Sequence, residues 1–181
     1  MREPQLQPLV EAGGPGRWAV EDAPENVAIR LAIGPSPRRI ELPRVEAALG
    51  RGTVVRDGTD AVLFAYGPVM LHEALTAAEA LQQRALRLQV VNMPWLNRVD
   101  APWLAELVEP FEDVFVLEDH APVGALGDAM RRVLDGRPVT VFGVEGWPAC
   151  GTPVEALRFH GLDGASLADR IAIVLRARAG A

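Results

Sequence analysis

From about residue 53 onward, short apolar runs alternate with longer stretches of helical periodicity. The apolar runs are typical of strands buried on both faces, and they lie at residues 61–66, 86–91, 114–117 and 139–144. The stretches between them predict helices at residues 67–81, 101–107 and 127–134. This alternation is typical of an α/β fold with right-handed crossovers. We therefore expect a three-layer α/β/α sandwich with a mixed, mostly parallel sheet of about five strands.

The predicted helices carry start signals. Pro68 stands where the first helix begins, a position at which its missing N–H costs no hydrogen bond. Asp100 precedes another helix and can accept from its free N–H groups. Two closing helices follow, each predicted by a hydroxyl residue with an acid three positions later, namely Thr152 with Glu155 and Ser166 with Asp169.

Residues 1–50 differ from the rest of the chain. Gly and Pro are concentrated at residues 13–16 and 34–37, as in loops. Residues 27–33 form an apolar run that predicts one strand, and little helix is expected around it. Such a segment cannot bury a core by itself. We expect residues 1–50 to be a tail plus linker and residues 51–181 to be the folded domain.

Composition narrows the class of protein. The 181 residues include 49% hydrophobic residues, enough to bury a core, and the net charge of −6 makes nucleic acid an unexpected partner. The single cysteine, Cys150, permits no intramolecular disulfide, and we expect it to be small and buried. The N-terminal residues lack the apolar core of a signal peptide, and no run reaches the roughly 20 apolar residues of a membrane span. We expect a cytoplasmic protein with no membrane partner.

Several segments follow one another in a characteristic order. Residues 57–91 read as a strand and an alanine-rich helix, residues 91–100 read VNMPWLNRVD, and residues 116–120 (VLEDH) are followed by residues 124–127 (GALG). Together they resemble the transketolase C-terminal domain, with its opening strand and helix, its next loop and its later glutamate and glycine motif. The likeness covers about residues 51–175 in the correct order. Two departures are Arg98, near the position of a family proline, and Gly124-Ala125 in place of a double glycine.

The resemblance implies a fold, partners and an activity. Residues 27–31 resemble the last strand of the pyrimidine-binding domain that precedes this domain in the family. One edge strand is expected to be antiparallel, either residues 53–56 or residues 139–144. The implied activity is transfer of a two-carbon ketol unit by a thiamine-diphosphate enzyme. A 1-deoxyxylulose-5-phosphate synthase and a 2-oxo-acid dehydrogenase beta fragment are alternatives, and so is a non-catalytic assembly domain that binds small anions.

The cofactor machinery of this family is absent from the sequence. The family binds Mg²⁺ and diphosphate with a GDG…N motif, and no GDG occurs here. We therefore expect no catalytic residue and no cofactor bound by this chain alone, with thiamine diphosphate and Mg²⁺ held in an assembled enzyme. The expected partners are the remaining transketolase domains or subunits, in a homodimer or hetero-oligomer.

Specific roles are expected for individual residues. By resemblance, Arg30 contacts a substrate phosphate, which suits a planar, permanently charged fork; the alternative is a surface arginine that anchors the tail. Glu118 and His120 permit an acid/base pair, but we favour a structural role in which Glu118 caps the following turn and His120 packs at a domain contact. Interface or structural roles are expected for Asp100, Asp119, Gly124 and Gly127 as well.

Structural roles are favoured for the remaining candidate site residues. Gly67 opens a helix whose N–H groups could bind an anion, but we favour a tight turn as the reason for this glycine. His72 and His160 have no carboxylate at ligand spacing, so no metal site is expected. The tryptophans Trp95, Trp103 and Trp147 are interpreted as core or interface residues.

Overall fold

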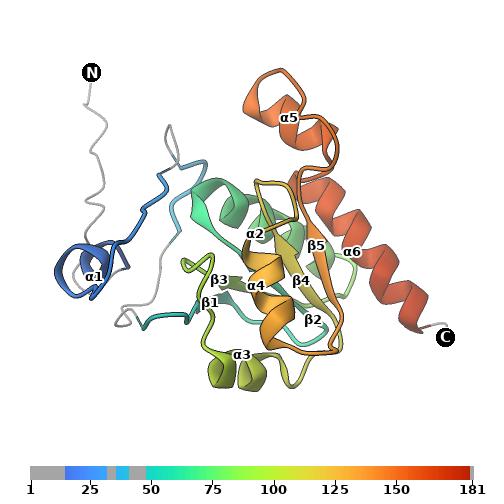
Figure 1. The fold of residues 1–181 in the computed structure, drawn as a ribbon. Coiled ribbons are helices and arrows are strands. Elements are labelled where there is room, and N and C mark those ends of the chain that lie inside the picture. Colours follow the sequence, from blue (N-terminus) through green and yellow to red (C-terminus); the bar gives the residue numbers. More distant parts are fainter. Residues whose placement is uncertain (1–14, 32–35, 41–47, 180–181) are drawn as a thin grey trace.

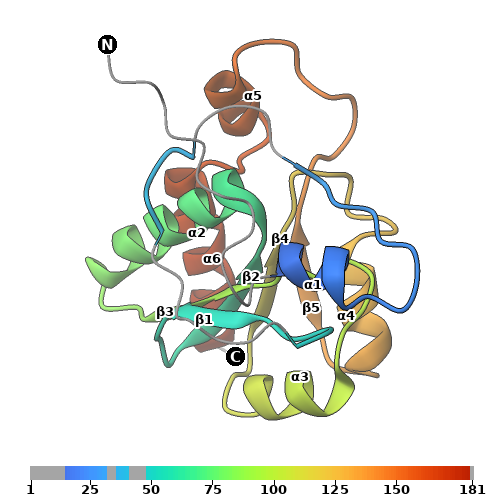
Figure 2. The same cartoon turned by 90° about the vertical axis from the view of Figure 1, so that its left-hand side faces the viewer.

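A computed structural model describes residues 15–31, 36–40 and 48–179. Within that part of the chain, five strands form one sheet and helices cover both of its faces (Figures 1 and 2). The strands are β1 (Thr53–Arg56), β2 (Ala61–Ala65), β3 (Leu88–Asn92), β4 (Val114–Leu117) and β5 (Val139–Phe142). The helices are α1 (Pro15–Glu21), α2 (Gly67–Gln82), α3 (Ala101–Val108), α4 (Leu126–Val133), α5 (Pro153–Phe159) and α6 (Gly164–Ala179). The predicted three-layer α/β/α architecture is confirmed.

The sheet has the strand order β1-β3-β2-β4-β5. β2 pairs in parallel with β3 and β4, and β4 pairs in parallel with β5. β1 pairs antiparallel with β3, with a bulge between Val54 and Arg56. The antiparallel edge strand is therefore residues 53–56, which resolves the choice that the sequence left open.

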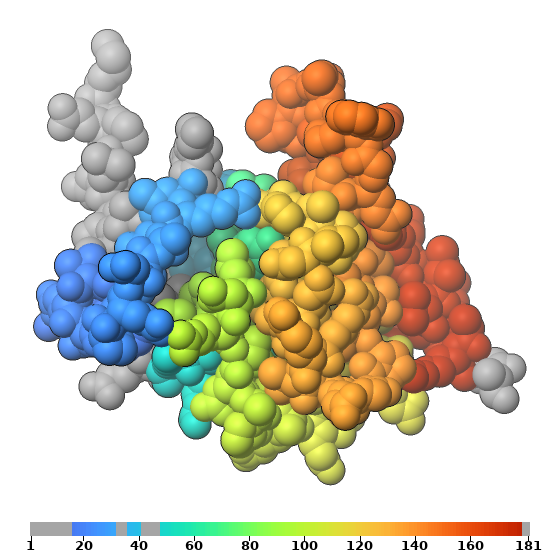
Figure 3. Space-filling model, viewed as in Figure 1, coloured from blue at the N-terminus to red at the C-terminus, as the bar shows by residue number. Residues whose placement is uncertain are grey.

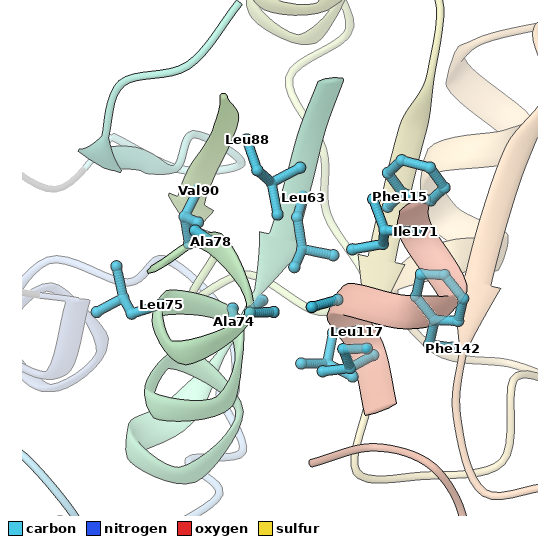
Figure 4. Packing of buried hydrophobic residues seen from close by; sticks show 14 of the residues in the cluster. Leu63, Ala74, Leu75, Ala78, Leu88, Val90, Phe115, Leu117, Phe142 and Ile171 are labelled. Carbon is cyan, nitrogen blue, oxygen red and sulfur yellow. The ribbon is translucent and has the colours of Figure 1, made fainter. Parts of the chain in front are cut away.

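Two apolar cores lie on opposite faces of the sheet because successive side chains in a strand point to opposite sides. In β2, Leu63 belongs to the core under α2 and α6, whereas Phe64 belongs to the core under α3 and α4. Figure 4 shows the first core, in which Leu63 and Phe115 of the sheet belong to the same cluster as Ala74 of α2 and Ile171 of α6. All five residues of β2 are fully buried, as expected for the central strand.

Several predicted boundaries require correction. The strand expected at residues 27–33 is wrong for residues 27–31, which are irregular and exposed, while residues 32 and 33 lie outside the described part. A strand needs a neighbour to pair with, and no described strand pairs with this segment. β3 begins two residues later than predicted and β5 ends at Phe142, before the predicted end. α1 was not predicted at all.

The predicted helix starts are correct in three of four cases, and Pro68 lies in the first turn of α2. Asp100 accepts from Trp103 N at 2.9 Å, and Thr152 forms the predicted capping box with Glu155. The box expected at Ser166 and Asp169 is wrong, because α6 already begins at Gly164. Asp163 caps α6 instead, accepting from Ser166 N at 3.3 Å.

Helix α5 and the loop before it project from the body of the molecule (Figures 1 and 3). No residue of α5 is buried. In the loop, Trp147 is 92% exposed, and Cys150 is exposed rather than buried as expected. Trp95 is buried, and Trp103 is partly buried against the core under α3 and α4. The burial prediction is wrong for Cys150 because its loop leaves the sheet beyond the end of β5, and Trp147 is not a core residue of this domain, while an interface role for Trp147 stays a prediction.

Candidate functional site

The centre of the sheet contains a topological switch point between β2 and β4. From β2 the chain crosses to β3 on one side, and it later returns to β4 on the other side. At such a point the connections leave the strand ends in opposite directions, and open α/β sheets bind ligands in the resulting crevice. Tyr66 follows β2 directly, and Glu118 and Asp119 follow β4, so their side chains lie at this edge.

Arg30 reaches the switch point from residues 15–31, which we call the leading segment. Its Nη1 and Nη2 atoms donate to the two carboxylate oxygens of Asp119 at 2.6 and 2.9 Å. The two residues are 89 positions apart in the sequence, so the ion pair fixes the leading segment against the carboxyl end of β4. The Arg30 side chain is nevertheless 57% exposed, and the hydrogen bonds to Asp119 raise its pKa further above its ordinary value.

Tyr66 completes this cluster beneath the ion pair. Its side chain is buried, and burial raises the pKa of its hydroxyl well above the ordinary value. The negative charges of Asp119 and Glu118 raise it further, while the positive charge of Arg30 acts in the opposite direction. The hydroxyl therefore stays protonated at neutral pH and remains available as a hydrogen-bond donor.

Glu118 is the buried charged residue of the described chain. Its Oε1 accepts from Gly127 N at 2.6 Å, whereas its Oε2 is buried without a partner. Burial raises the pKa of this carboxyl, and the bond from Gly127 partly opposes that effect. The contact places a carboxylate at the positive N-terminal end of α4, the geometry expected of a cap. A Cβ atom on Gly127 would lie 2.4 Å from Val141 Cγ2, so the close approach requires glycine.

His120 does not hydrogen-bond to Glu118. The His120 side chain is exposed, and its Nδ1 lies 2.7 Å from the carbonyl oxygen of Ala121. That distance indicates a donated N–H and assigns the proton to Nδ1 in this tautomer. The structure therefore does not bring the conceivable acid/base pair together. An interface role for His120 stays a prediction.

The other predicted site residues stabilise turns. Gly124 has a φ of +76° and donates its N–H to Asp128 Oδ2 at 2.6 Å, which shapes the turn before α4. Asp100 lies elsewhere, where it accepts from Arg51 Nε at 2.9 Å as well as from α3. Its pKa is lowered, first by the bond from the Trp103 N–H and then by Arg51.

Gly67 opens α2 with a φ of +68°, and a Cβ atom there would meet nothing within 4 Å. The glycine is thus required by backbone conformation and not by crowding. Anion binding at this turn stays a prediction. Within residues 15–31, 36–40 and 48–179, no cluster of His, Cys, Asp and Glu could hold a metal ion. The same residues include no helix with the length and apolar character needed to cross a bilayer.

Sequence reasoning missed two features of this region. Tyr66 was treated as the last residue of a buried strand, although a polar aromatic residue at the carboxyl end of such a run is itself a signal. The second missed feature is the packing of α1 on the domain, where the Trp18 and Trp95 rings meet edge to face with centroids 5.0 Å apart. Arg98 and Glu25 form a further ion pair between the body and the leading segment.

The fold and the motifs at its strand ends define a class of α/β domain known from thiamine-dependent transferases. A family model described as "Transketolase, C-terminal domain" matches residues 50–167. The chain therefore belongs to the transketolase C-terminal domain family.

Relatives of this chain are longer proteins. It is 31% identical over 135 residues to a 1-deoxy-D-xylulose-5-phosphate synthase from Synechococcus, covering 72% of this chain and 21% of that protein. It is 31% identical over 170 residues to a protein described as a transketolase C-terminal section from Methanocaldococcus jannaschii, covering 81% of this chain and 51% of that protein. The chain thus spans about a fifth to about half the length of these relatives.

Solved structures agree with this assignment. A split gene transketolase, described as an inactive beta4 tetramer, is 30% identical with a TM-score of 0.69, covering 77% of this chain and 46% of that chain. A transketolase from Campylobacter jejuni has a TM-score of 0.53 at 16% identity, covering 74% of this chain and 20% of that chain. The second likeness shows the fold alone.

Proposed function

We propose that this chain supplies the C-terminal domain of a thiamine-diphosphate-dependent, transketolase-like enzyme that transfers a two-carbon ketol unit. Its role is architectural: it supports the assembly and braces the neighbouring domain that carries out the chemistry. Membership in the transketolase C-terminal domain family supports this proposal. The cofactor would act as the electron sink for the carbanion and would be held by other domains.

The observation that carries the proposal is that the leading segment is tied to the domain by Arg30 while its apolar side chains are exposed. Arg30 faces the body and pairs with Asp119. The side chains of Val27, Ile29 and Leu31 alternate with it and are 39%, 51% and 57% exposed. The ion pair of Arg30 thus holds the segment at the domain, while three apolar side chains beside it stay exposed and open to a neighbour.

An apolar, extended segment of this kind is suited to complete a sheet in another domain. Its backbone N–H and C=O groups need partners once they are covered, and an added strand satisfies them. The resemblance of residues 27–31 to the last strand of the pyrimidine-binding domain identifies that neighbour in the proposal. Val27 and Ile29 would then be buried in the assembled enzyme.

The residues of this chain do not fit the cofactor itself. Mg²⁺ in such a site takes oxygen ligands together with a diphosphate, and no cluster of acidic or histidine ligands occurs among the described residues. No GDG sequence occurs in the chain either. We infer that thiamine diphosphate and Mg²⁺ belong to the partner domains or subunits, and that the assembled enzyme is cytoplasmic.

The partners in this proposal are the other transketolase domains, on separate subunits or on the same polypeptide. Two relatives support a split arrangement: the protein described as a transketolase C-terminal section, and one of the subunits of an apulose-4-phosphate transketolase from Phocaeicola vulgatus. Either a homodimer or a hetero-oligomer is compatible with the presented segment.

A 1-deoxyxylulose-5-phosphate synthase is the second candidate, favoured by the relatives of that name from Synechococcus and Chlorobium luteolum. A 2-oxo-acid dehydrogenase beta fragment remains a further alternative within the enzyme class, and a non-catalytic assembly domain is the alternative outside it. The two leading activities differ in substrate: the synthase condenses a two-carbon unit from a 2-oxo acid with an aldose phosphate, whereas the transketolase takes that unit from a ketose phosphate.

Reconstitution tests the proposal. The chain is combined with a polypeptide from the same genome that carries the GDG…N motif, and turnover is assayed with a ketose phosphate and, separately, with pyruvate. We expect turnover only when both polypeptides and thiamine diphosphate are present. The control replaces the Asp of the partner's GDG motif by Ala and should be inactive. Calorimetry of the chain alone with thiamine diphosphate and Mg²⁺ is expected to show no binding. Micromolar binding there, or an inactive mixture, would refute the proposal.

A further inference from the structure

Residues 36–40, which we call the linker segment, lie against α2. Nη1 and Nη2 of Arg38 donate to the two carboxylate oxygens of Glu79 at 2.8 and 3.2 Å. Nε of the same guanidinium donates to Nδ1 of His72 at 3.2 Å. Ile40 packs against the core under α2 and α6. The linker segment is thus attached by an apolar contact at its end and by a charged contact in which one guanidinium bonds to two residues of α2.

The hydrogen bond from Arg38 sets the protonation state of His72. A guanidinium has N–H donors and no acceptor, so the ring nitrogen that faces it carries no proton. His72 is therefore the neutral tautomer with its proton on Nε2, which lies 4.0 Å from Oε1 of Glu73. A doubly protonated ring would turn an N–H toward Arg38 and add a second positive charge beside it. The His72 and Arg38 side chains are 26% and 30% exposed, so water screens this repulsion only in part.

Carboxylates of α2 are the other charged groups that face His72. Glu79 is held ionised, because hydrogen bonds from Arg38 lower its pKa and the charge of Arg56 on β1 lowers it further. Glu73 also accepts from the first backbone N–H of α6 at 2.6 Å. Both carboxylates attract a protonated His72 whether or not Arg38 is bound, whereas Arg38 repels it when bound. A bound Arg38 and a second proton on His72 therefore oppose each other.

We propose that His72 is a pH-sensitive latch for the linker segment: in its neutral form it accepts from Arg38 and holds the segment on α2, and in its protonated form it releases Arg38. A proton that opposes the attached form favours the released form by linkage, so attachment is present at higher pH and is lost as pH falls. Histidine changes its charge between about pH 5 and 8, so mild acidification is enough. Release lengthens the tether between residues 15–31 and the domain. The latch is a property of this chain and does not depend on the function proposed above.

NMR of the full chain between about pH 7.5 and about pH 5.5 tests the latch. The ring signal of His72 reports its protonation, and the heteronuclear NOE of the Arg38 amide reports motion of the linker segment on the ps–ns timescale. We expect the NOE to fall as pH falls, with the same midpoint as the His72 titration. His72→Asn keeps a neutral oxygen acceptor near the position of Nδ1 and does not titrate. Its Arg38 amide should stay ordered across the whole range.

The matched control is His120→Asn, which removes an exposed histidine whose Nδ1 bonds to the Ala121 carbonyl oxygen and not to the linker segment. We expect it to keep the pH response of the wild type. Arg38→Gln removes the charged contact and should make the linker segment mobile at every pH. An Arg38 amide that stays ordered while His72 becomes protonated overturns the inference, and so does a wild-type pH response in His72→Asn.

Discussion

Gly164, the first residue of α6, lies directly against Thr76 of α2. A Cβ atom on Gly164 would lie 2.5 Å from Thr76 Cβ, closer than non-bonded carbon atoms approach. The same glycine donates its N–H to Glu73 Oε2 at 2.6 Å. The two long helices on this face of the sheet therefore meet backbone to side chain at the start of α6, and their spacing depends on the absence of a side chain.

Gly164→Ala is expected to destabilise the domain by about 1–3 kcal/mol, the usual cost of overpacking. The higher helix propensity of alanine offsets only part of that cost. Urea unfolding measures the effect, with Ala165→Ser at the exposed neighbouring position as the control, expected within about 0.5 kcal/mol of the wild type. An unchanged unfolding midpoint for Gly164→Ala would show that α6 moves away from α2 without cost.

Gly127→Ala tests the second close approach, between α4 and β5. The new methyl group would overlap Val141 Cγ2 and crowd Glu118 Oε1, so we expect a loss of about 1–3 kcal/mol. Because the clash is specific, Val141→Ala in the same chain should restore part of that loss. A double-mutant cycle measures the coupling, expected at about 1 kcal/mol or more. Strict additivity of the two substitutions would rule out the contact as the cause.

Glu118→Gln is expected to change the pH dependence of stability. Burial raises the pKa of this carboxyl in the folded protein above its unfolded value, so folding favours the protonated form. Its contribution to stability is greatest below the unfolded pKa and declines as pH rises through the folded pKa. The uncharged glutamine lacks this decline. Its stability relative to wild type should therefore be better at about pH 8 than at about pH 5.

The measurement is urea unfolding of wild type and Glu118→Gln at both pH values. Glu118→Ala serves for comparison, because it leaves the buried Gly127 N–H without an acceptor and should cost about 1–3 kcal/mol. A stability difference between wild type and Glu118→Gln that does not vary with pH would mean that the folded carboxyl titrates normally.

Trp18→Ala is expected to loosen the leading segment while leaving the domain folded. Trp18 meets the buried Trp95 edge to face, and such pairs contribute about 0.5–1.5 kcal/mol. Trypsin cleavage after Arg30 should therefore accelerate roughly two- to tenfold. Trp147→Ala, at an exposed tryptophan, is the control and should leave the cleavage rate unchanged. Equal cleavage rates for the wild type and both variants would mean that the ion pairs alone hold the segment on the domain.

The sequence predicted the elements that are buried on both faces. β2 and β4 read as uninterrupted apolar runs because no residue in them meets water. β1 was harder to predict because its four residues are all only partly buried. Its direction depends on pairing with β3, which follows in the chain only after β2 and α2. Direction is a tertiary property of that pair. No local pattern within residues 53–56 encodes it.

Contacts between distant segments account for the other differences. α1 is docked by Trp18 on Trp95, and its own seven residues carry no acidic or basic start or stop signal. At α6 the predicted cap Ser166 is replaced by Asp163, which lies one residue before the first helical position. Arg30 and Asp119 are both predicted site residues. Their pairing across 89 positions, and the place of Tyr66 beneath them, required the fold.

The free edge of β5 affects whether copies of this protein pair with one another at high concentration. β5 has one neighbour within the described sheet, so its far side resembles a template on which a strand from another molecule could grow. Arg131 of α4 reaches over this border and donates to the Val139 carbonyl at 2.9 Å. This bond occupies a carbonyl group at the start of β5, so one acceptor fewer is open to a strand from another molecule.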